Sequence, residues 1–264
     1  MNGDLYIPAA CFDSHAHYDD ARFDTDRGTL LAALPGMGVG RVINAASSVE
    51  SSRASVALAE AFAYIRAAVG VHPHEAGALD EAGFSELEKL LADADDSRYI
   101  AAIGEIGLDY YYDNAPREAQ RYWFKRQLAL AGERNLPAVI HSREAAAETF
   151  GIIKDSGVRR GVIHCYSGGA QMAMDYIKMG FFIGVGGAVT FEKSKKTREA
   201  VKEIPLEYIL IETDAPYLTP APHRGKRNDS SYLKYITGAI AEIKHITPGA
   251  VAETTYKNAE GLFT

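Results

Sequence analysis

The run Cys11-Phe12-Asp13-Ser14-His15-Ala16-His17 has the composition of a β-strand that carries two histidines at its carboxyl end. Alternate side chains of a strand point to the same face, so His15 and His17 are expected to face one point. Two neutral imidazoles that converge in this way can bind a metal ion. A His-x-His pair is short enough to arise by chance, so its meaning depends on which other residues meet it.

Seven further apolar runs follow along the chain at spacings of roughly 20 to 40 residues, and segments with helical periodicity separate them. One such helix is expected after a Ser85 cap, with Leu87, Leu90 and Leu91 on its apolar face, and a long one over residues 116–134. Repeated βα units of this number predict an α/β protein with a single (β/α)8 TIM-type barrel. The predicted strands are residues 11–17, 41–46, 65–71, 99–106, 138–141, 161–164, 181–185 and 208–212.

Composition limits the class of protein. The chain has 264 residues, of which 47% are hydrophobic and 24% charged, which suits one large core. We therefore predict one domain over residues 1–264, with residues 1–10 as an N-terminal extension. The formal net charge of -7 excludes a generally basic nucleic-acid binder, so any contact with a polyanion must be local. The two cysteines lie in apolar runs, and no apolar run approaches 18 residues, so we predict a reduced cytoplasmic protein without a membrane segment.

The carboxyl ends of the predicted strands hold an unusual share of the titratable residues. Six of the eight histidines lie there, whereas histidines placed for packing or solubility would be scattered over helices and loops. Active sites of (β/α)8 barrels are built at these strand ends. The concentration therefore predicts a metal centre, and the strand ends carry His15, His17, His72, His74, Glu105, His141, His164 and Asp214.

The donor set is larger than one ion requires. A catalytic zinc site uses about three protein ligands, whereas six strong candidates suit two cations about 3.5–4 Å apart that share a carboxylate. Glu105 is the expected bridge, because it lies on a middle strand. The alternative, a glutamate in a tight turn over Gly104-Glu105-Ile106-Gly107, is disfavoured because an unpaired carboxylate among apolar residues is costly. Asp214 is expected to bind the first metal and to orient or deprotonate the attacking water. Glu212 is its rival, one layer deeper on the same strand.

Six short motifs follow one another along the chain. They are Asp13-Ser14-His15-Ala16-His17, Gly70-Val71-His72-Pro73-His74, Gly104-Glu105-Ile106-Gly107-Leu108-Asp109-Tyr110, Ile140-His141-Ser142-Arg143, His164-Cys165-Tyr166-Ser167-Gly168 and Thr213-Asp214-Ala215-Pro216-Tyr217-Leu218. With these motifs the chain resembles the TatD-like metal-dependent deoxyribonucleases, and the similarity extends through Arg224-Gly225-Lys226-Arg227-Asn228 to the carboxyl terminus. The resemblance implies a TIM-type barrel, a binuclear divalent-metal site and hydrolysis of DNA phosphodiesters.

The resemblance also implies a division of the ligands. His15, His17, Glu105 and Asp214 would bind one metal, and Glu105, His141 and His164 the other. Zn, Mn, Mg and Co all suit such ligands, so the sequence does not name the metal. In the family an acid and a proline commonly follow the Arg-Gly-Lys-Arg-Asn run, whereas here Asp229-Ser230-Ser231 follow it, so we expect a less rigid loop.

Basic residues are expected where a backbone phosphate would lie, because loops after strands seven and eight of such barrels are frequent phosphate sites. Tyr110, Tyr111 and Tyr112 could stack on bases or simply pack the barrel rim. His72 and His74 are expected either to support the metal ligands or to contact substrate, and one of them could instead cap the loop at Pro73. We predict DNA as substrate, single-stranded or at ends, with substrate contacts at His72, His74, Arg143 and Arg224. The basic residues of the two loops are Lys193, Lys195, Lys196, Arg198, His223, Arg224, Lys226 and Arg227.

Two other classes of function share this donor set: a metal-dependent hydrolase of amides, lactones or aminoacyl esters, and a metal-binding scaffold without catalysis. An acid placed to activate water argues against the scaffold. The glycines at 184, 186 and 187 lack the spacing and acidic partner of a dinucleotide loop, so no organic cofactor is expected. Cys165 is not predicted to be a nucleophile, because its neighbour His164 is assigned to a metal.

Overall fold

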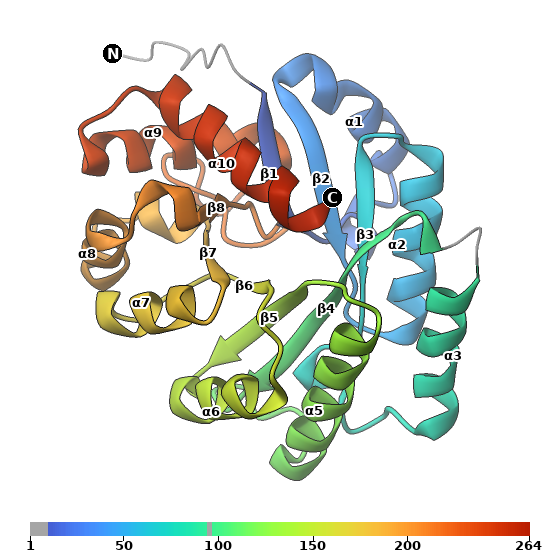
Figure 1. Cartoon of the computed structure of the whole chain (residues 1–264). Helices are drawn as coiled ribbons and strands as arrows, with labels where there is room; N and C mark the ends of the chain where they lie inside the picture. The colour runs from blue at the N-terminus through green and yellow to red at the C-terminus, as the bar shows by residue number, and fades with distance from the viewer. Residues whose placement is uncertain (1–9, 94–96) are drawn as a thin grey trace. The chain divides into compact units, whose positions relative to one another are not determined.

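The computed structural model describes residues 10–93 and 97–264. Eight strands, β1 to β8, are hydrogen-bonded in chain order and alternate with helices (Figure 1). The pairs β3–β4, β4–β5, β5–β6 and β7–β8 are parallel, and a bridge between Ala16 and Ala215 joins the ends of β1 and β8. This topology is that of a (β/α)8 TIM-type barrel, so the predicted fold class is confirmed. The predicted N-terminal extension, except Ala10, lies outside the described residues.

All eight strands form where apolar, β-branched runs predict them. The largest difference is at β4, which continues three residues beyond its predicted end, and the ends of the other strands lie within two residues of the predicted ones. The strands are β1 (Cys11–Ala16), β2 (Val39–Ala45), β3 (Ile65–Val69), β4 (Ile100–Asp109), β5 (Ala138–Arg143), β6 (Gly161–Ile163), β7 (Phe181–Val185) and β8 (Ile209–Ile211).

Helices connect the strands, and their ends follow local capping chemistry. Asp80 caps the helix α3 by accepting a hydrogen bond from the Gly83 amide at 2.8 Å, so the predicted cap at Ser85 is wrong and Ser85 lies inside the helix. Pro116 directly precedes α5, close to the predicted start. The helices are α1 (Arg27–Ala33), α2 (Val49–Ala61), α3 (Glu81–Ala92), α5 (Arg117–Glu133), α6 (Ala146–Ser156), α7 (Ala170–Lys178), α8 (Lys195–Glu203), α9 (Leu233–Lys244) and α10 (Pro248–Phe263).

The described chain separates into two compact units. The first unit comprises residues 10–42, 165–177 and 182–261. In it β7 pairs with β8, with Ile183 opposite Ile209, and α9 packs on β1 and β8 through the buried side chains of Ile236 and Ile240. The carboxyl ends of β1 and β8 therefore lie together, which places the residues that follow them at one edge of this unit.

The second unit comprises residues 43–164, 178–181 and 262–264. Strands β3, β4, β5 and β6 pair in parallel, with α2 packed on β3 and α5 on β4 (Figure 1). The amide of Gln127, on the buried face of α5, bonds the backbone N–H and C=O of Val71 at 2.7 and 3.1 Å. This bond pair satisfies the backbone just past β3 and fixes the chain that leads to His72.

Strand β4 carries a bulge that determines which way its polar residues point. Ile103 lies opposite Ala138 and Ile106 opposite Ile140, so β4 has one residue more than β5 over this stretch. Gly107 has a φ of 146°, and a Cβ at this position would collide with the carbonyl oxygen of His141. Only glycine therefore permits this close approach of β4 to β5.

In the part of the chain that the structure describes, no helix is both long and apolar enough to cross a membrane. Location in the cytoplasm and the single-domain organisation stay predictions.

Candidate functional site

A first cluster of metal-donor atoms lies where β1 and β8 end, in the first unit. The Nε2 atoms of His15 and His17 are 3.1 Å apart, and a carboxylate oxygen of Asp214 is 3.9 Å from the first and 3.3 Å from the second. His15 is fully buried, whereas the side chains of His17 and Asp214 are 13% and 14% exposed. The His-x-His pair thus converges as strand alternation predicts, with a carboxylate that is open to solvent beside it.

Asp13 holds this cluster together and was not predicted as a site residue. Its carboxylate accepts hydrogen bonds from the Thr213 amide and hydroxyl at 2.9 and 2.6 Å, and from the Ser230 hydroxyl at 2.6 Å. Burial raises the pKa of Asp13 to about 7, although these hydrogen bonds oppose the rise. Asp13 therefore ties the residue before Asp214 to β1, and only the tertiary structure brings these partners together.

The loop that follows Asn228 is anchored by several hydrogen bonds, and the expectation that it is less rigid stays a prediction. Asn228 donates hydrogen bonds to the carbonyls of Thr213 and Tyr217 at 2.8 and 2.6 Å. The Ser230 amide donates to the Tyr18 hydroxyl at 2.8 Å, and Asp229 caps the turn by accepting from the Ser231 amide at 2.9 Å. Hydrogen bonds that involve Asn228, Asp229 and Ser230 thus tie this loop to Tyr18 and to the residues around Asp214.

A second cluster lies in the second unit, around Glu105. Glu105 lies inside β4, which continues to Asp109, and its side chain is almost fully buried. This agrees with the predicted strand over residues 99–106 and excludes the tight turn that was the less favoured alternative. One of its oxygens lies 2.8 Å from Nδ1 of His141 and 3.7 Å from Nε2 of both His72 and His164. The bulge in β4 lets this carboxylate face the three imidazoles.

His72 is placed among the donors, although the sequence predicted it as a support for the metal ligands, a substrate contact or a loop cap. Its Nε2 joins Glu105 and His141 in one potential metal-binding group. Its Nδ1 accepts a hydrogen bond from the His74 amide at 3.1 Å, which confirms the alternative that one of these histidines caps the loop at Pro73. The two ring nitrogens thus have different tasks, and a substrate contact at His72 stays a prediction.

Asp109 is a buried carboxylate that the sequence analysis quoted in a motif but did not assign. Its Oδ2 lies 3.1 Å from Nε2 of His141 and 2.9 Å from Nε2 of His74. Burial would raise its pKa, but hydrogen bonds from His141, the Tyr112 amide and His74 outweigh burial and lower it. Likewise burial favours neutral His141, yet the carboxylates of Asp109 and Glu105 raise its pKa. Asp109 thus orients His141 with Nδ1 toward Glu105, as carboxylates behind metal-binding histidines do.

Both clusters fit a divalent cation. Zinc binds imidazole nitrogen and carboxylate oxygen at about 2.0–2.2 Å, so two ligand atoms of one ion lie no more than about 4.4 Å apart. The donor separations in the first cluster run from 3.1 to 3.9 Å. The distances from Glu105 in the second cluster run from 2.8 to 3.7 Å. Buried imidazoles and carboxylates at these distances can surround an ion in each cluster.

Glu212, the predicted alternative to Asp214 as metal ligand and proton acceptor, contacts the backbone instead. Its buried carboxylate accepts a hydrogen bond from the Cys165 amide at 2.6 Å. A Cβ on residue 184 would lie 2.5 Å from Glu212 Oε2, so Gly184 leaves room for this carboxylate. The glycines that superficially suggest a dinucleotide loop thus accommodate an acidic side chain in the core of the first unit.

The predicted phosphate-binding cations differ in how far they are already paired. Arg227 forms a two-pronged ion pair with Asp26 at 2.7 and 2.6 Å, and Arg198 lies 3.7 Å from Glu242. Arg224 is exposed and places its guanidinium 4.0 Å from the centre of the Phe191 ring, with no carboxylate within 4.0 Å in the described chain. Arg224 therefore keeps its charge available at the loop after β8, whereas Arg227 and Arg198 secure the structure.

The three consecutive tyrosines after β4 also divide into two kinds. Tyr110 donates a hydrogen bond to Glu148 at 2.7 Å and receives one from Arg121, as expected for a side chain that packs the rim. Tyr111 and Tyr112 are exposed, and the guanidinium of Arg143 lies over both rings. Arg143 and these two tyrosines therefore form an exposed surface in the second unit.

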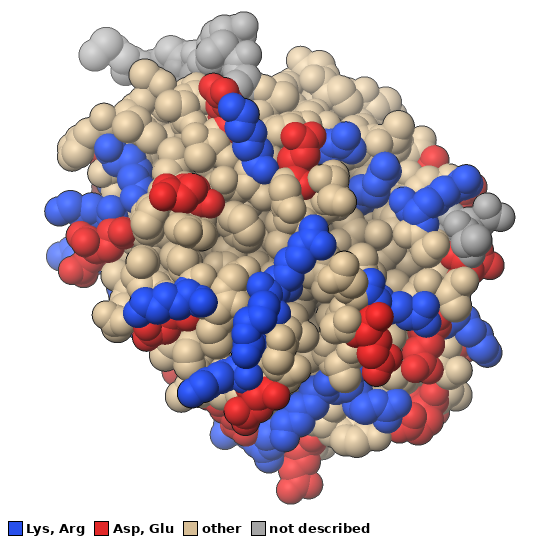
Figure 2. Space-filling model, viewed as in Figure 1, with Lys and Arg blue, Asp and Glu red and all other residues tan. Residues whose placement is uncertain are grey.

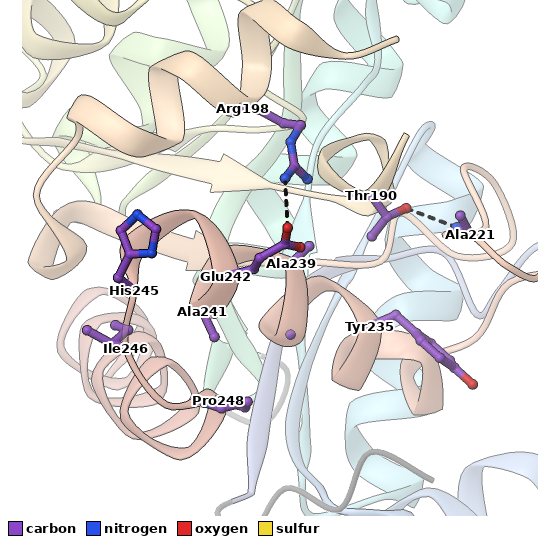
Figure 3. Close-up of a pocket in the computed structure, with 11 residues that line it drawn as sticks. Thr190, Arg198, Ala221, Tyr235, Ala239, Ala241, Glu242, His245, Ile246 and Pro248 are labelled. Atoms are coloured by element: carbon purple, nitrogen blue, oxygen red, sulfur yellow. Dashed lines mark hydrogen bonds and ion pairs between the residues drawn. The ribbon is translucent and has the colours of Figure 1, made fainter. Parts of the chain in front are cut away.

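Basic and acidic side chains are intermixed on the face of the molecule drawn in Figure 2. A surface cavity of about 640 Å³ lies in the first unit (Figure 3). The ion pair between Arg198 and Glu242 and the hydrogen bond from the Ala221 amide to Thr190 lie at its wall. None of the predicted metal ligands lines it, so the cavity is separate from the donor clusters.

The fold and the two donor clusters define a metal-dependent hydrolase. The family model described as "TatD related DNase" matches residues 12–264. The chain is 39% identical to the uncharacterized metal-dependent hydrolase YabD of Bacillus subtilis, over 96% of this chain and 98% of that protein. It is 36% identical to the uncharacterized metal-dependent hydrolase TatD of Mycobacterium tuberculosis, over 95% of this chain and 97% of that protein.

Comparison with solved structures shows the same similarity. The crystal structure of YjjV, a TatD homologue from Escherichia coli, has a TM-score of 0.90 and 30% identity, covering 96% of this chain and 97% of that one. A TatD family hydrolase from Entamoeba histolytica has a TM-score of 0.86 at 22% identity, which concerns the fold alone. The protein belongs to the TatD family of metal-dependent hydrolases.

Proposed function

We propose that the protein is a divalent-metal-dependent deoxyribonuclease that hydrolyses DNA phosphodiester bonds, at strand ends or in single strands. The observation that supports DNA over a neutral substrate is the exposed Arg143 on the rings of Tyr111 and Tyr112, close to the second cluster through Asp109. Guanidinium groups bind phosphates, and aromatic faces stack on bases.

In this proposal His15, His17 and Asp214 hold one cation, and Glu105 and His141 with His72 or His164 hold another. A bound divalent cation acts as a Lewis acid on the phosphoryl group and activates water. Asp214 belongs to the first cluster, and its side chain is partly exposed to solvent. In this proposal its carboxylate orients the attacking water and accepts a proton from it. That Glu105 bridges the two cations stays a prediction from the sequence.

Arg224 and Lys226 are proposed to bind the phosphates that flank the cleaved bond. Both are exposed in the loop after β8, and neither has a carboxylate within 4.0 Å in the described part of the chain. Such contacts position a strand without reading its sequence.

The test is cleavage of 5′- and 3′-labelled single- and double-stranded oligonucleotides by metal-free and metal-loaded protein. We expect no cleavage after treatment with EDTA and recovery when Mn, Zn, Co or Mg is added, with elemental analysis identifying the metal carried from purification. Cleavage that persists undiminished in EDTA would overturn the proposal.

A charge reversal separates DNA from the amide, lactone or aminoacyl-ester alternative. Arg224→Glu with Lys226→Glu is expected to lower cleavage of DNA steeply, and added salt should do the same to the wild type. The matched control reverses two exposed lysines on α5 and α8, Lys125→Glu and Lys202→Glu. If the wild type hydrolyses a neutral ester and neither variant changes that rate, the alternative replaces the proposal.

A further inference from the structure

We propose that Tyr111, Tyr112 and Arg143 form a platform on which one unpaired base of the DNA strand stacks beside the second cluster. We call these three residues the stacking platform. This inference rests on the proposed function and adds to it a specific subsite, and with it a reason for a preference for unpaired DNA.

The platform presents aromatic surface to solvent. Tyr111 and Tyr112 are 59% and 54% exposed, and their rings meet edge to face with centroids 5.0 Å apart. The Arg143 guanidinium lies 4.3 Å from the centre of one ring and 4.7 Å from the other. Adjacent exposed tyrosines are not explained by packing of the core, and an arginine over aromatic rings is the combination that binds bases in single-strand channels.

The charge of Arg143 has no acidic partner among residues 10–93 and 97–264. In the described residues no carboxylate lies within 4.0 Å of its guanidinium. The first unit holds a contrasting arrangement, in which Arg22 lies 4.0 Å over the ring of Tyr217 but makes two hydrogen bonds to Asp20, both at 2.9 Å. The stacking platform therefore retains a positive charge for the phosphate next to a stacked base, whereas the pair of Arg22 and Tyr217 does not.

Asp109 fixes the platform relative to the metal donors. Its Oδ1 accepts hydrogen bonds from the amides of Tyr111 and Tyr112 at 3.0 and 2.9 Å. Its Oδ2 contacts the rings of His74 and His141. The ring of Tyr112 also meets that of His74, with centroids 5.4 Å apart. One buried carboxylate thus links the platform to a predicted ligand, so a base on the platform has a fixed position with respect to the second cluster.

The geometry restricts the substrate. In a duplex both faces of a base are covered by its neighbours, so only a base that is single-stranded, frayed or terminal can present a face to the platform. The protein is accordingly expected to need one base at a fixed distance from the cleaved bond.

The experiment is a double-mutant cycle with metal-loaded protein and single-stranded oligonucleotides in which one nucleotide at a time is replaced by an abasic tetrahydrofuran. For the wild type, one abasic position is expected to raise KM about tenfold, since stacking of a base on an aromatic ring contributes on the order of 1–3 kcal/mol. Tyr111→Ala with Tyr112→Ala should raise KM for the intact strand by the same factor and abolish the effect of the abasic position. Tyr111→Phe with Tyr112→Phe should recover most of the lost affinity.

The control is Tyr208→Ala. Tyr208 is an exposed tyrosine directly before the amino end of β8, whereas Tyr111 and Tyr112 follow the carboxyl end of β4. Circular dichroism establishes that each variant is folded. If DNA is cleaved but the alanine variant keeps both the wild-type KM and the abasic effect, the stacking platform is refuted and the deoxyribonuclease assignment stands. If no DNA is cleaved by metal-loaded wild type, the proposed function itself fails.

Discussion

Asp109 is expected to orient the metal-binding histidines without binding the metal itself, so replacing it tests how far metal affinity depends on this orientation. Asp109→Asn keeps the size of the side chain but removes the charge and one of the two oxygens that accept hydrogen bonds from His141, His74 and the tyrosine amides. We expect the affinity of the second cluster for metal to fall about 10- to 100-fold, as for other carboxylates behind metal-binding histidines. Competition with a chromophoric chelator measures this affinity.

The control for that measurement is Asp113→Asn, four residues further along, which removes only an exposed ion pair with Arg117. Equal metal affinity in Asp109→Asn and the wild type would show that His141 needs no orientation by a carboxylate.

His15 and His17 test the division of ligands between two ions. Because their Nε2 atoms and Asp214 form one potential metal-binding group, His15→Ala with His17→Ala should lose one bound metal while His72, Glu105 and His141 retain another. Mass spectrometry of the metal content gives the stoichiometry. His245→Asn is the control, since His245 is exposed at the end of α9 with φ of 57° and asparagine tolerates that backbone. Loss of both metals together contradicts the division.

Among the elements, strands were easier to predict than the orientation of their polar residues. The apolar runs that form β1, β5 and β7 are locally evident, because β-branched residues between helical segments leave few alternatives. The extra residue in β4 arises from its pairing with β5, which no local pattern contains. The sequence therefore indicated Glu105 as a ligand near the end of a strand, but not the bulge that precedes Ile106 in that strand.

In the candidate site, too, some residues could be predicted from local sequence and others could not. His15, His17 and Asp214 were expected at strand ends, and the structure gathers them there, because alternation along a strand fixes the direction of the two imidazoles. Asp13 and Asp109 were not assigned, since their partners are separated in the chain: Asp13 bonds Thr213, and Asp109 bonds His74 and His141. An acid within two residues of a histidine motif, or at the end of an apolar strand, is the signal that could have found them.

Helix α3 offers a test of the revised cap. Asp80→Ala removes the side-chain acceptor of the Gly83 amide, so the free energy of unfolding should fall by about 1 kcal/mol. Urea denaturation measures the change. Lys89→Ala, an exposed substitution within the same helix, should alter stability by less than about 0.5 kcal/mol. A Ser85→Ala variant that loses as much stability as Asp80→Ala would restore the cap first expected.

For the whole molecule, metal and stability are expected to be coupled. Each cluster holds carboxylate and imidazole groups together, and an ion that binds only the folded protein stabilises it, by about 2.7 kcal/mol at a hundredfold excess over Kd. We therefore expect EDTA to lower Tm by several degrees and added metal to restore it, as measured by differential scanning calorimetry. The His15→Ala and His17→Ala double variant should show a smaller decrease. An identical Tm with and without EDTA would mean that no ion contributes to the folded state.

A Cβ at position 107 would collide with the carbonyl oxygen of His141, and this restriction limits how the sequence can change in evolution. Any missense change of a glycine codon adds at least a Cβ, so this position offers a diverging lineage no graded substitution. A histidine or carboxylate ligand can be exchanged for another donor, and the protein can drift to a new metal. Because no side chain fits at position 107, substitution cannot change the spacing between β4 and β5 there in small steps. Variants of this centre that keep the spacing must therefore keep Gly107.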